Sequence, residues 1–177
     1  MEWNRFSMSA LRLINETELT SGVSSFSVTD IFTEDFDIYK VVLSDWVSTN
    51  GYWYLRPLNS SGSVITSGND HATLLIRSHS SFIEYRGTNT ASLWSTSNIC
   101  YEDGNDGVFY FFNPYSTSSY TFVLGQDAGF GFGNNLNTKN IGVQTSTTRV
   151  TGIQITQQSA GTFSSGKVKT YGLRVDS

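Results

Sequence analysis

Hydrophobic and polar residues alternate with a period of two through most of this chain. Residues 37–45 concentrate β-branched and aromatic side chains between carboxylates, and one face of the extended chain there carries Tyr39, Val41 and Leu43. Upstream, residues 22–29 alternate serines with Val23, Phe26 and Val28. The pattern predicts that residues 21–45 form two strands joined by an acidic turn, with an apolar core side and a hydroxyl-rich outer side.

Similar patterns predict about ten strands in the chain as a whole. Asn50-Gly51 is a strong hairpin signal, and it separates two aromatic-rich segments, 46–49 and 52–55. A polar turn follows in which Gly62 is expected to adopt a positive φ. The remaining short strands are predicted at 64–65, 73–77, 81–86, 108–112, 120–124, 140–144, 150–156 and 167–175.

Two segments depart from simple alternation. Val108–Phe112 is apolar on both faces, which predicts a strand buried between two layers. Residues 125–135 space Gly129, Gly131 and Gly133 around two phenylalanines, and we predict a flexible loop there. The sequence indicates no helix after the N-terminus, so the expected fold is all-β: a single antiparallel β-sandwich or jelly roll.

The N-terminal twenty residues allow two interpretations. Trp3, Phe6, Ala10 and Leu13 would line a short helix, whereas Leu11 and Leu13 would share one face of a strand. We favour an extended arm that leads into a strand, because large rings on a polar tail gain stability only by docking. The expected organisation is an arm and first strand in residues 1–20 and a sandwich domain in residues 21–177.

Composition narrows the classes of function. Aromatic residues make up 14% of the 177 residues, charged residues only 15%, and the net charge is −4 without any basic run. We therefore expect no nucleic-acid partner. The single cysteine, Cys100, forms no intrachain disulfide, and neither a signal peptide nor a run of about 20 apolar residues is evident, so we expect cytoplasmic synthesis and no membrane insertion.

Two acidic segments suggest chemistry, and a structural interpretation is favoured for both. Glu102–Gly107 offers oxygen ligands for calcium, but it lacks the ligand spacing and the closing bidentate Glu of the known loop. Glu34, Asp35 and Asp37 could pair as in glycoside hydrolysis, yet adjacent carboxylates in a turn are normally both exposed and both ionised. We expect solvated turns, no metal and no catalytic site.

The remaining reactive residues carry little signal. His71 and His79 have no metal-ligand spacing, and no Gly-x-Ser-x-Gly elbow is present among the many serines. Cys100 follows Ile99 in an apolar setting, which is typical of a small core residue. The glycine-rich segment 129–133 lacks the Lys-Ser/Thr of a phosphate loop. We therefore expect no cofactor and no enzyme activity.

A glycan-binding function is the main alternative. Exposed rings stack on sugar faces while amides and carboxylates bind hydroxyls. The candidates lie beside the Asn50-Gly51 turn and after the 108–112 strand: Trp46, Tyr52, Trp53, Asn113 and Tyr115. The competing interpretation, which we favour, is that most of these rings fill the core or a contact between subunits.

Several strand-and-turn motifs carry a resemblance that covers roughly Leu13 to Val175. They are residues 21–29 leading into 39–42, Leu58–Ile65, Asn113–Phe122, Ile141–Val143 with Val150–Ile153, and Ser165–Val168. With these motifs the chain resembles a family of small Ser/Thr/Gly-rich virion structural proteins of tailed bacteriophages of aquatic bacteria, cyanobacterial phages among them. The resemblance implies a β-sandwich or jelly roll on the virion, without catalytic residues.

The resemblance and the residue patterns together give one functional expectation. We expect a capsid-surface decoration (cement) protein that forms a homo-oligomer, with a trimer favoured, and that contacts the major capsid protein. The alternative is a tail-fibre or spike module that contacts tail proteins and binds host surface polysaccharide. The expected assembly contacts are Trp3 and Phe6 in the arm and Phe130 and Phe132 in the glycine-phenylalanine segment.

Overall fold

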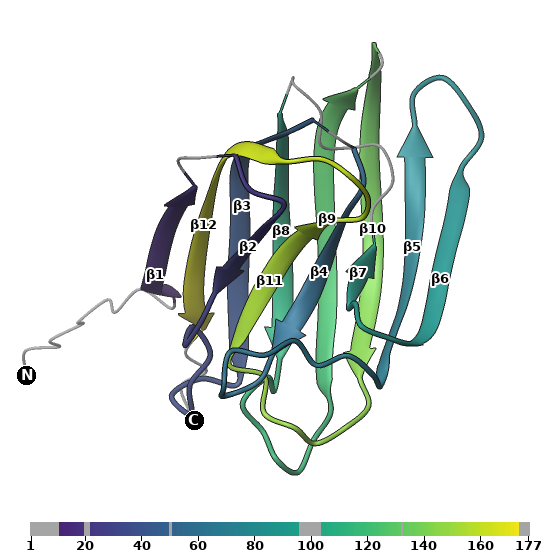
Figure 1. The fold of residues 1–177 in the computed structure, drawn as a ribbon. Helices are drawn as coiled ribbons and strands as arrows, with labels where there is room; N and C mark the ends of the chain where they lie inside the picture. Colours follow the sequence, from purple (N-terminus) through teal and green to yellow (C-terminus); the bar gives the residue numbers. More distant parts are fainter. Residues whose placement is uncertain (1–10, 20–21, 50, 96–103, 132, 174–177) are drawn as a thin grey trace, which may run out of the picture.

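The chain folds into two antiparallel β-sheets that pack face to face (Figure 1). The computed structural model describes residues 11–19, 22–49, 51–95, 104–131 and 133–173, and it contains no helix in these ranges. The large sheet has the spatial order β1 (Leu11–Leu19), β12 (Phe163–Leu173), β3 (Ile38–Ser48), β8 (Asn105–Phe112), β9 (Thr121–Gly131), β10 (Asn134–Gln144), β5 (Asn69–Arg77), β6 (Ile83–Thr90). The small sheet has the order β2 (Ser25–Val28), β11 (Gly152–Gln157), β4 (Trp53–Leu58), β7 (Trp94–Ser95). The predicted all-β sandwich is confirmed.

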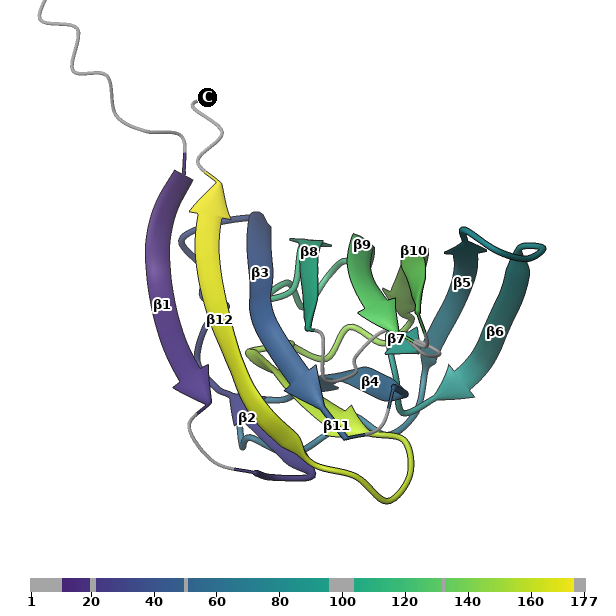
Figure 2. The same cartoon turned by 90° about the horizontal axis from the view of Figure 1, so that it is seen from above.

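The two layers are unequal in size. Eight strands form one sheet and four form the other. Viewed from above, the small sheet lies on one side of the large sheet, and the opposite side carries no strand of the described chain (Figure 2). The large sheet therefore has an inward face, which packs on the small sheet, and an outward face.

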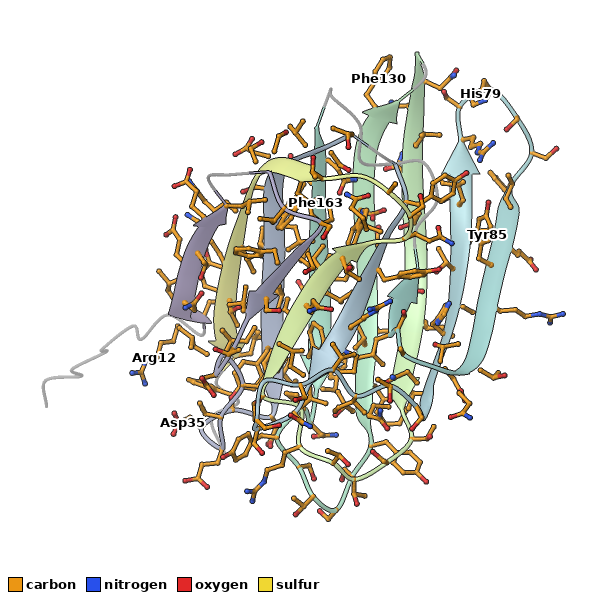
Figure 3. All side chains as sticks on the ribbon, viewed as in Figure 1. Arg12, Asp35, His79, Tyr85, Phe130 and Phe163 are labelled. Carbon is orange, nitrogen blue, oxygen red and sulfur yellow. The ribbon has the colours of Figure 1, made fainter. Side chains whose placement is uncertain are left out.

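Aromatic side chains fill the space between the sheets. Tyr39, Phe109 and Phe111 point inward from the large sheet and are fully buried. Trp53 comes from the small sheet, and its ring meets that of Phe109 edge-on at 6.2 Å between centroids. Phe163 lies between the sheets (Figure 3). Burying a large ring contributes roughly 1.5–3 kcal/mol, so these contacts dominate the stability of the sandwich.

The segment that joins β2 to β3 crosses from one sheet to the other. Its acidic turn is exposed at Glu34, Asp35 and Asp37, as predicted. The turn is fixed from inside, because the Tyr39 hydroxyl donates to the Thr33 carbonyl oxygen at 2.8 Å and accepts from the Thr33 backbone N–H at 2.8 Å. The two predicted strands exist, but they belong to different layers.

A break in strand register redirects the end of β3. Tyr39, Val41 and Leu43 point inward, so strict alternation would send Asp45 inward and Trp46 outward. Asp45 instead has a φ of 57°, and the pairing with β8 shifts between Leu43 and Trp46. This bulge turns the Trp46 ring into the core, where only 2% of the residue is exposed.

The predicted hairpin at Asn50-Gly51 is wrong. Asn50 lies outside the described residues, but the strands on either side of it belong to different sheets: β3 pairs with β12 and β8, whereas β4 pairs with β11 and β7. An Asn-Gly turn determines only a local change of chain direction. Which strands then pair depends on the layer in which each strand buries its apolar face. Here Trp53 is buried by crossing to the small sheet.

The glycine-phenylalanine segment is mostly strand. β9 extends to Gly131 and pairs with β10 along its whole length, from Thr121 with Gln144 to Gly131 with Asn134. The predicted long loop is therefore wrong, and the reversal is confined to the few residues around Gly133, whose φ is 74°. Cross-strand hydrogen bonds compensate for the low strand propensity of glycine here.

Most other predicted strands are confirmed with shifted ends. Leu11–Leu19 is a strand, as favoured, and Gly62 has a φ of 74°. Residues 64–65 make only an isolated bridge, between Val64 and Leu58. The N-terminal arm, residues 1–10, lies outside the described residues.

Candidate functional site

The outward face of the large sheet carries a group of large apolar side chains. The register aligns Tyr110 with Leu124 and Leu124 with Ile141, on three adjacent strands. Phe112 and Phe122 form the next pair along β8 and β9. Leu13 lies on the same face at the β1 edge, with 50% of the residue exposed. We call this group the outer band: Leu13, Tyr110, Phe112, Phe122, Leu124 and Ile141.

The exposure of the outer band is high for residues of this size. Phe122, Leu124 and Ile141 are 47%, 48% and 59% exposed. A shallow hollow of about 470 Å³ between β9, β10, β5 and β6 is lined by these three side chains and by Arg86. Large contiguous apolar patches on soluble proteins usually mark interaction sites. The band is therefore the strongest candidate binding surface among the described residues.

The prediction that Val108–Phe112 is buried on both faces is wrong for the isolated chain. Phe109 and Phe111 are fully buried, whereas Val108, Tyr110 and Phe112 are only partly buried. The small sheet covers one side of β8 and nothing in the described chain forms a layer on the other. The sequence pattern therefore indicates a second layer that the described residues do not supply.

Polar residues occupy the inward face of β9 and β10, where a core strand would normally be apolar. Asn140 accepts from the Thr73 hydroxyl at 2.7 Å and donates to the Leu93 carbonyl oxygen at 3.2 Å. Gln144 donates to the Asn69 side-chain oxygen at 2.8 Å and to the Ser67 carbonyl oxygen at 3.0 Å. These bonds satisfy the buried polar groups. The two strands thus turn hydrogen-bonding side chains inward and apolar side chains such as Ile141 outward.

A buried carboxyl group lies among these inward polar residues. Asp127 is 3% exposed, and its Oδ1 accepts a hydrogen bond from the Thr138 hydroxyl. Burial raises the pKa of Asp127 to about 7, because removal from water disfavours the charged form more than the Thr138 hydrogen bonds favour it. Asp127 points to the opposite side of the sheet from the outer band. It therefore affects the stability of the fold and is not part of the band.

A second candidate surface is a polar pocket at one end of the sandwich. Asn113 and Tyr115 line it together with Glu34, Asp37 and Arg149. The Arg149 guanidinium lies 4.7 Å from the Tyr115 ring centroid, and the Asn113 backbone N–H donates to the Asp37 carbonyl oxygen at 2.7 Å. The pocket therefore combines a ring, carboxylates and a guanidinium, which are groups that bind polyhydroxylated ligands.

The structure separates the five predicted glycan contacts. Asn113 and Tyr115 lie together in the end pocket. Trp46 and Trp53 are each 2% exposed and fill the core, as the favoured interpretation has it, so the alternative that these two rings stack on a glycan is wrong. Tyr52 directly precedes β4 and is partly buried. Arg149 was missed, because a single basic residue in a polar loop gives no sequence signal.

Of the predicted assembly contacts, Phe130 is described. It is 45% exposed near the tip of the β9–β10 hairpin, at the end of the sandwich opposite Asp35 (Figure 3). Trp3, Phe6 and Phe132 lie outside the described residues. The residues of the outer band were missed as contacts, although apolar residues on both alternating positions of β8 gave the signal.

Of the residues considered for catalysis, Glu34 and Asp37 both line the end pocket. No group of three or more potential metal-ligating side chains occurs in the described ranges. Asn105 and Asp106 belong to β8, and Asp106 accepts from the Asp45 backbone N–H at 2.8 Å. Burial lowers the pKa of His71, whose Nδ1 lies 3.2 Å from the Ser92 carbonyl oxygen, and His79 is exposed. Glu102, Asp103 and Cys100 lie outside the described residues.

Comparison with known proteins adds no assignment. No protein-family model and no curated protein matches the chain. Across the residues that the structure covers, no helix is long and apolar enough to cross a membrane.

Proposed function

We propose that this chain is a non-enzymatic structural protein of a bacteriophage virion, acting as a decoration protein on the capsid surface. The observation that carries the proposal is the outer band, a broad apolar surface on a rigid sheet. Such a surface suits permanent contact with other proteins, because exposed apolar patches of this kind are stabilised by burial in an interface. The family resemblance in the strand-and-turn motifs is consistent with this role.

The proposed mechanism is adhesive. Each copy contacts its neighbours and the major capsid protein, and many individually weak contacts add up around a closed shell. A sandwich built from hydrogen-bonded strands offers rigidity without disulfides, which suits a protein made in a reducing compartment. The partners proposed are further copies of the chain and the major capsid protein.

The test is the amount of the protein in purified particles. Particles from a host that expresses the chain together with the phage structural genes would be purified by density gradient, and peptide mass spectrometry would give the ratio of the chain to the major capsid protein. Hundreds of copies per particle are expected for decoration. A few dozen copies or fewer would indicate a tail component, and absence from the particles would overturn the virion assignment.

The end pocket supports a second candidate function, that of a tail module binding host surface polysaccharide. Tyr115 supplies a ring, while Asn113, Glu34 and Arg149 supply hydrogen-bonding groups at the same end of the sandwich. In this function the end pocket would bind the polysaccharide, and the outer band would contact other proteins of the virion.

A glycan array with matched variants separates the two functions. Tyr115→Ala should abolish any glycan signal, whereas Tyr120→Ala should retain it, because Tyr120 is 47% exposed and is not part of the pocket. Both variants should keep the wild-type melting temperature to within a few degrees. Absence of a signal from the wild-type protein on a broad array would reject the polysaccharide-binding candidate.

A further inference from the structure

We infer that a second copy of this chain covers the outer band, so that two large sheets stack face to face in a two-fold dimer. This goes beyond the proposed function and needs only the geometry of the sheet. It gives β8 the second layer that its two-sided apolar sequence indicates. It also replaces the trimer expected from the sequence with a dimer.

The area of the face matches what a stable pair requires. With strands about 4.8 Å apart and outward residues about 6.7 Å apart along each strand, three rows of side chains across the seven strands from β12 to β6 occupy a flat area of roughly 680 Å². A standard stable interface buries about 800 Å² per partner. Because the accessible surface of protruding side chains exceeds the flat area beneath them, a second copy of the sheet is large enough for such an interface, and stacked sheets pack about 10 Å apart.

The apolar row runs across the sheet, perpendicular to the strands. The register connects Leu13 to Tyr171 at the β1 edge and passes through Lys40 on β3 before it reaches Tyr110, Leu124 and Ile141. It then continues through Ala72 to Arg86, so the row is uninterruptedly apolar only from Tyr110 to Ala72. A rotation of 180° about an axis that is parallel to the strands and passes over β9 places Leu124 on Leu124 and Tyr110 on Ile141. Apolar side chains therefore meet over β8, β9 and β10, in an isologous contact, while Lys40 comes to lie opposite Ala72.

The charges on this face also favour a second copy. The whole chain carries a net charge of −4. On the described outward face, by contrast, cationic and anionic side chains are equal in number: Lys40, Arg86, Lys139, Lys167 and Lys169 against Glu16, Glu18, Asp70, Glu84 and Asp106. Two such faces approach each other without net electrostatic repulsion. A strongly charged partner, by contrast, would meet no net opposite charge on this face.

Part of this charge is already paired within the chain. The Lys169 Nζ lies 3.3 Å from Glu16 Oε1, and the Lys167 Nζ lies 3.9 Å from the same oxygen. These pairs flank the apolar row at the β1 side. They place a polar rim beside an apolar centre, which is the usual anatomy of a protein interface.

The experiment measures mass in solution for three matched proteins. Ile141→Lys adds one positive charge to the centre of the outer band, at a residue that is 59% exposed. Ser25→Lys adds the same charge on the outward side of the small sheet, where Ser25 is exposed. Light scattering after size-exclusion chromatography, with dilution from about 200 to 2 μM, should give a wild-type dimer of twice 19.6 kDa.

We expect Ile141→Lys to be monomeric and Ser25→Lys to remain dimeric, with the dissociation constant of Ile141→Lys raised at least about 100-fold. Leu124→Lys is a second interface variant if Ile141→Lys has a lower melting temperature than the wild type. A monomeric wild type at all concentrations, a trimer, or a dimer that both interface variants preserve would overturn the inference. The measurement uses no virion, so its failure and that of the proposed function are distinguishable.

Discussion

Phe112 and Phe122 lie directly opposite each other on β8 and β9, on the side of the large sheet that the small sheet does not cover. One residue earlier on β8, Phe111 points to the other side and is fully buried. Two adjacent phenylalanines of one strand therefore have different environments. The difference shows that β8 has two apolar faces and that the described part of the chain forms a layer over only one of them.

Substitution of Phe111 and of Phe112 should have different effects on the stability of the monomer, because only Phe111 lies in the core. Phe111→Ala should lower the free energy of unfolding by about 3–5 kcal/mol, because it leaves a cavity in the core. Phe112→Ala should cost the monomer about 1 kcal/mol or less, the scale of a cross-strand contact on a partly exposed face. Urea unfolding at a protein concentration too low for association checks both values. Equal losses would contradict the assignment of the two faces.

Gly166 should be intolerant of even a methyl group. A Cβ at this position would lie 2.7 Å from the Trp46 ring, which is buried in the core. We expect Gly166→Ala to cost about 1–3 kcal/mol through overpacking. Gly22→Ala is the control, since its Cβ would find its nearest neighbour at 3.7 Å. Thermal melts of the two variants check the prediction, and a melting temperature for Gly166→Ala equal to that of the control would contradict the packing.

The hydroxyl of Tyr39 should contribute measurably to stability. It accepts from the Thr33 N–H and donates to the Thr33 carbonyl oxygen, both at 2.8 Å. Tyr39→Phe leaves these partly buried backbone groups without that partner, and we expect a loss of about 1–3 kcal/mol. Tyr120→Phe, at a residue that is 47% exposed, should change stability by less than about 0.5 kcal/mol. Guanidinium denaturation of the pair gives both numbers.

Asp127 should make the protein less stable as pH rises from about 4 to about 8. Burial raises the pKa of this carboxyl from 3.8 to about 7, so the native state retains a proton that the unfolded chain releases above pH 4. The stabilisation of the protonated group is complete below pH 4 and is lost as pH rises through 7. The shift corresponds to on the order of 4 kcal/mol.

Other groups also titrate in this range, so the contribution of Asp127 is the difference in pH dependence of the unfolding free energy between the wild type and a variant without this carboxyl group. Unfolding free energies would be measured at several values between pH 4.5 and 8 for the wild type and for Asp127→Asn, which keeps an oxygen to accept from Thr138. We expect the wild type to lose more stability than the variant over this range. Parallel profiles would show that Asp127 does not titrate there.

The sequence by itself determined the fold class and most strand positions. Period-two alternation places Tyr39, Val41 and Leu43 on one face of β3, and burial of that face removes all three side chains from water. The composition of the turns gave the exposed acidic turn and the positive φ of Gly62. These features depend on neighbouring residues, so they are readable from local sequence.

Tertiary structure decided how the strands are shared between the layers. The bulge at Asp45 turned Trp46 from a surface candidate into a core residue, and the crossing after β3 replaced the expected hairpin. Hydrogen bonds from Asn140 and Gln144 to distant residues allowed polar groups to point inward and Ile141 to point outward. Such choices depend on contacts between residues far apart in the chain. For this reason the outer band became visible only when all eight strands of the large sheet were in register.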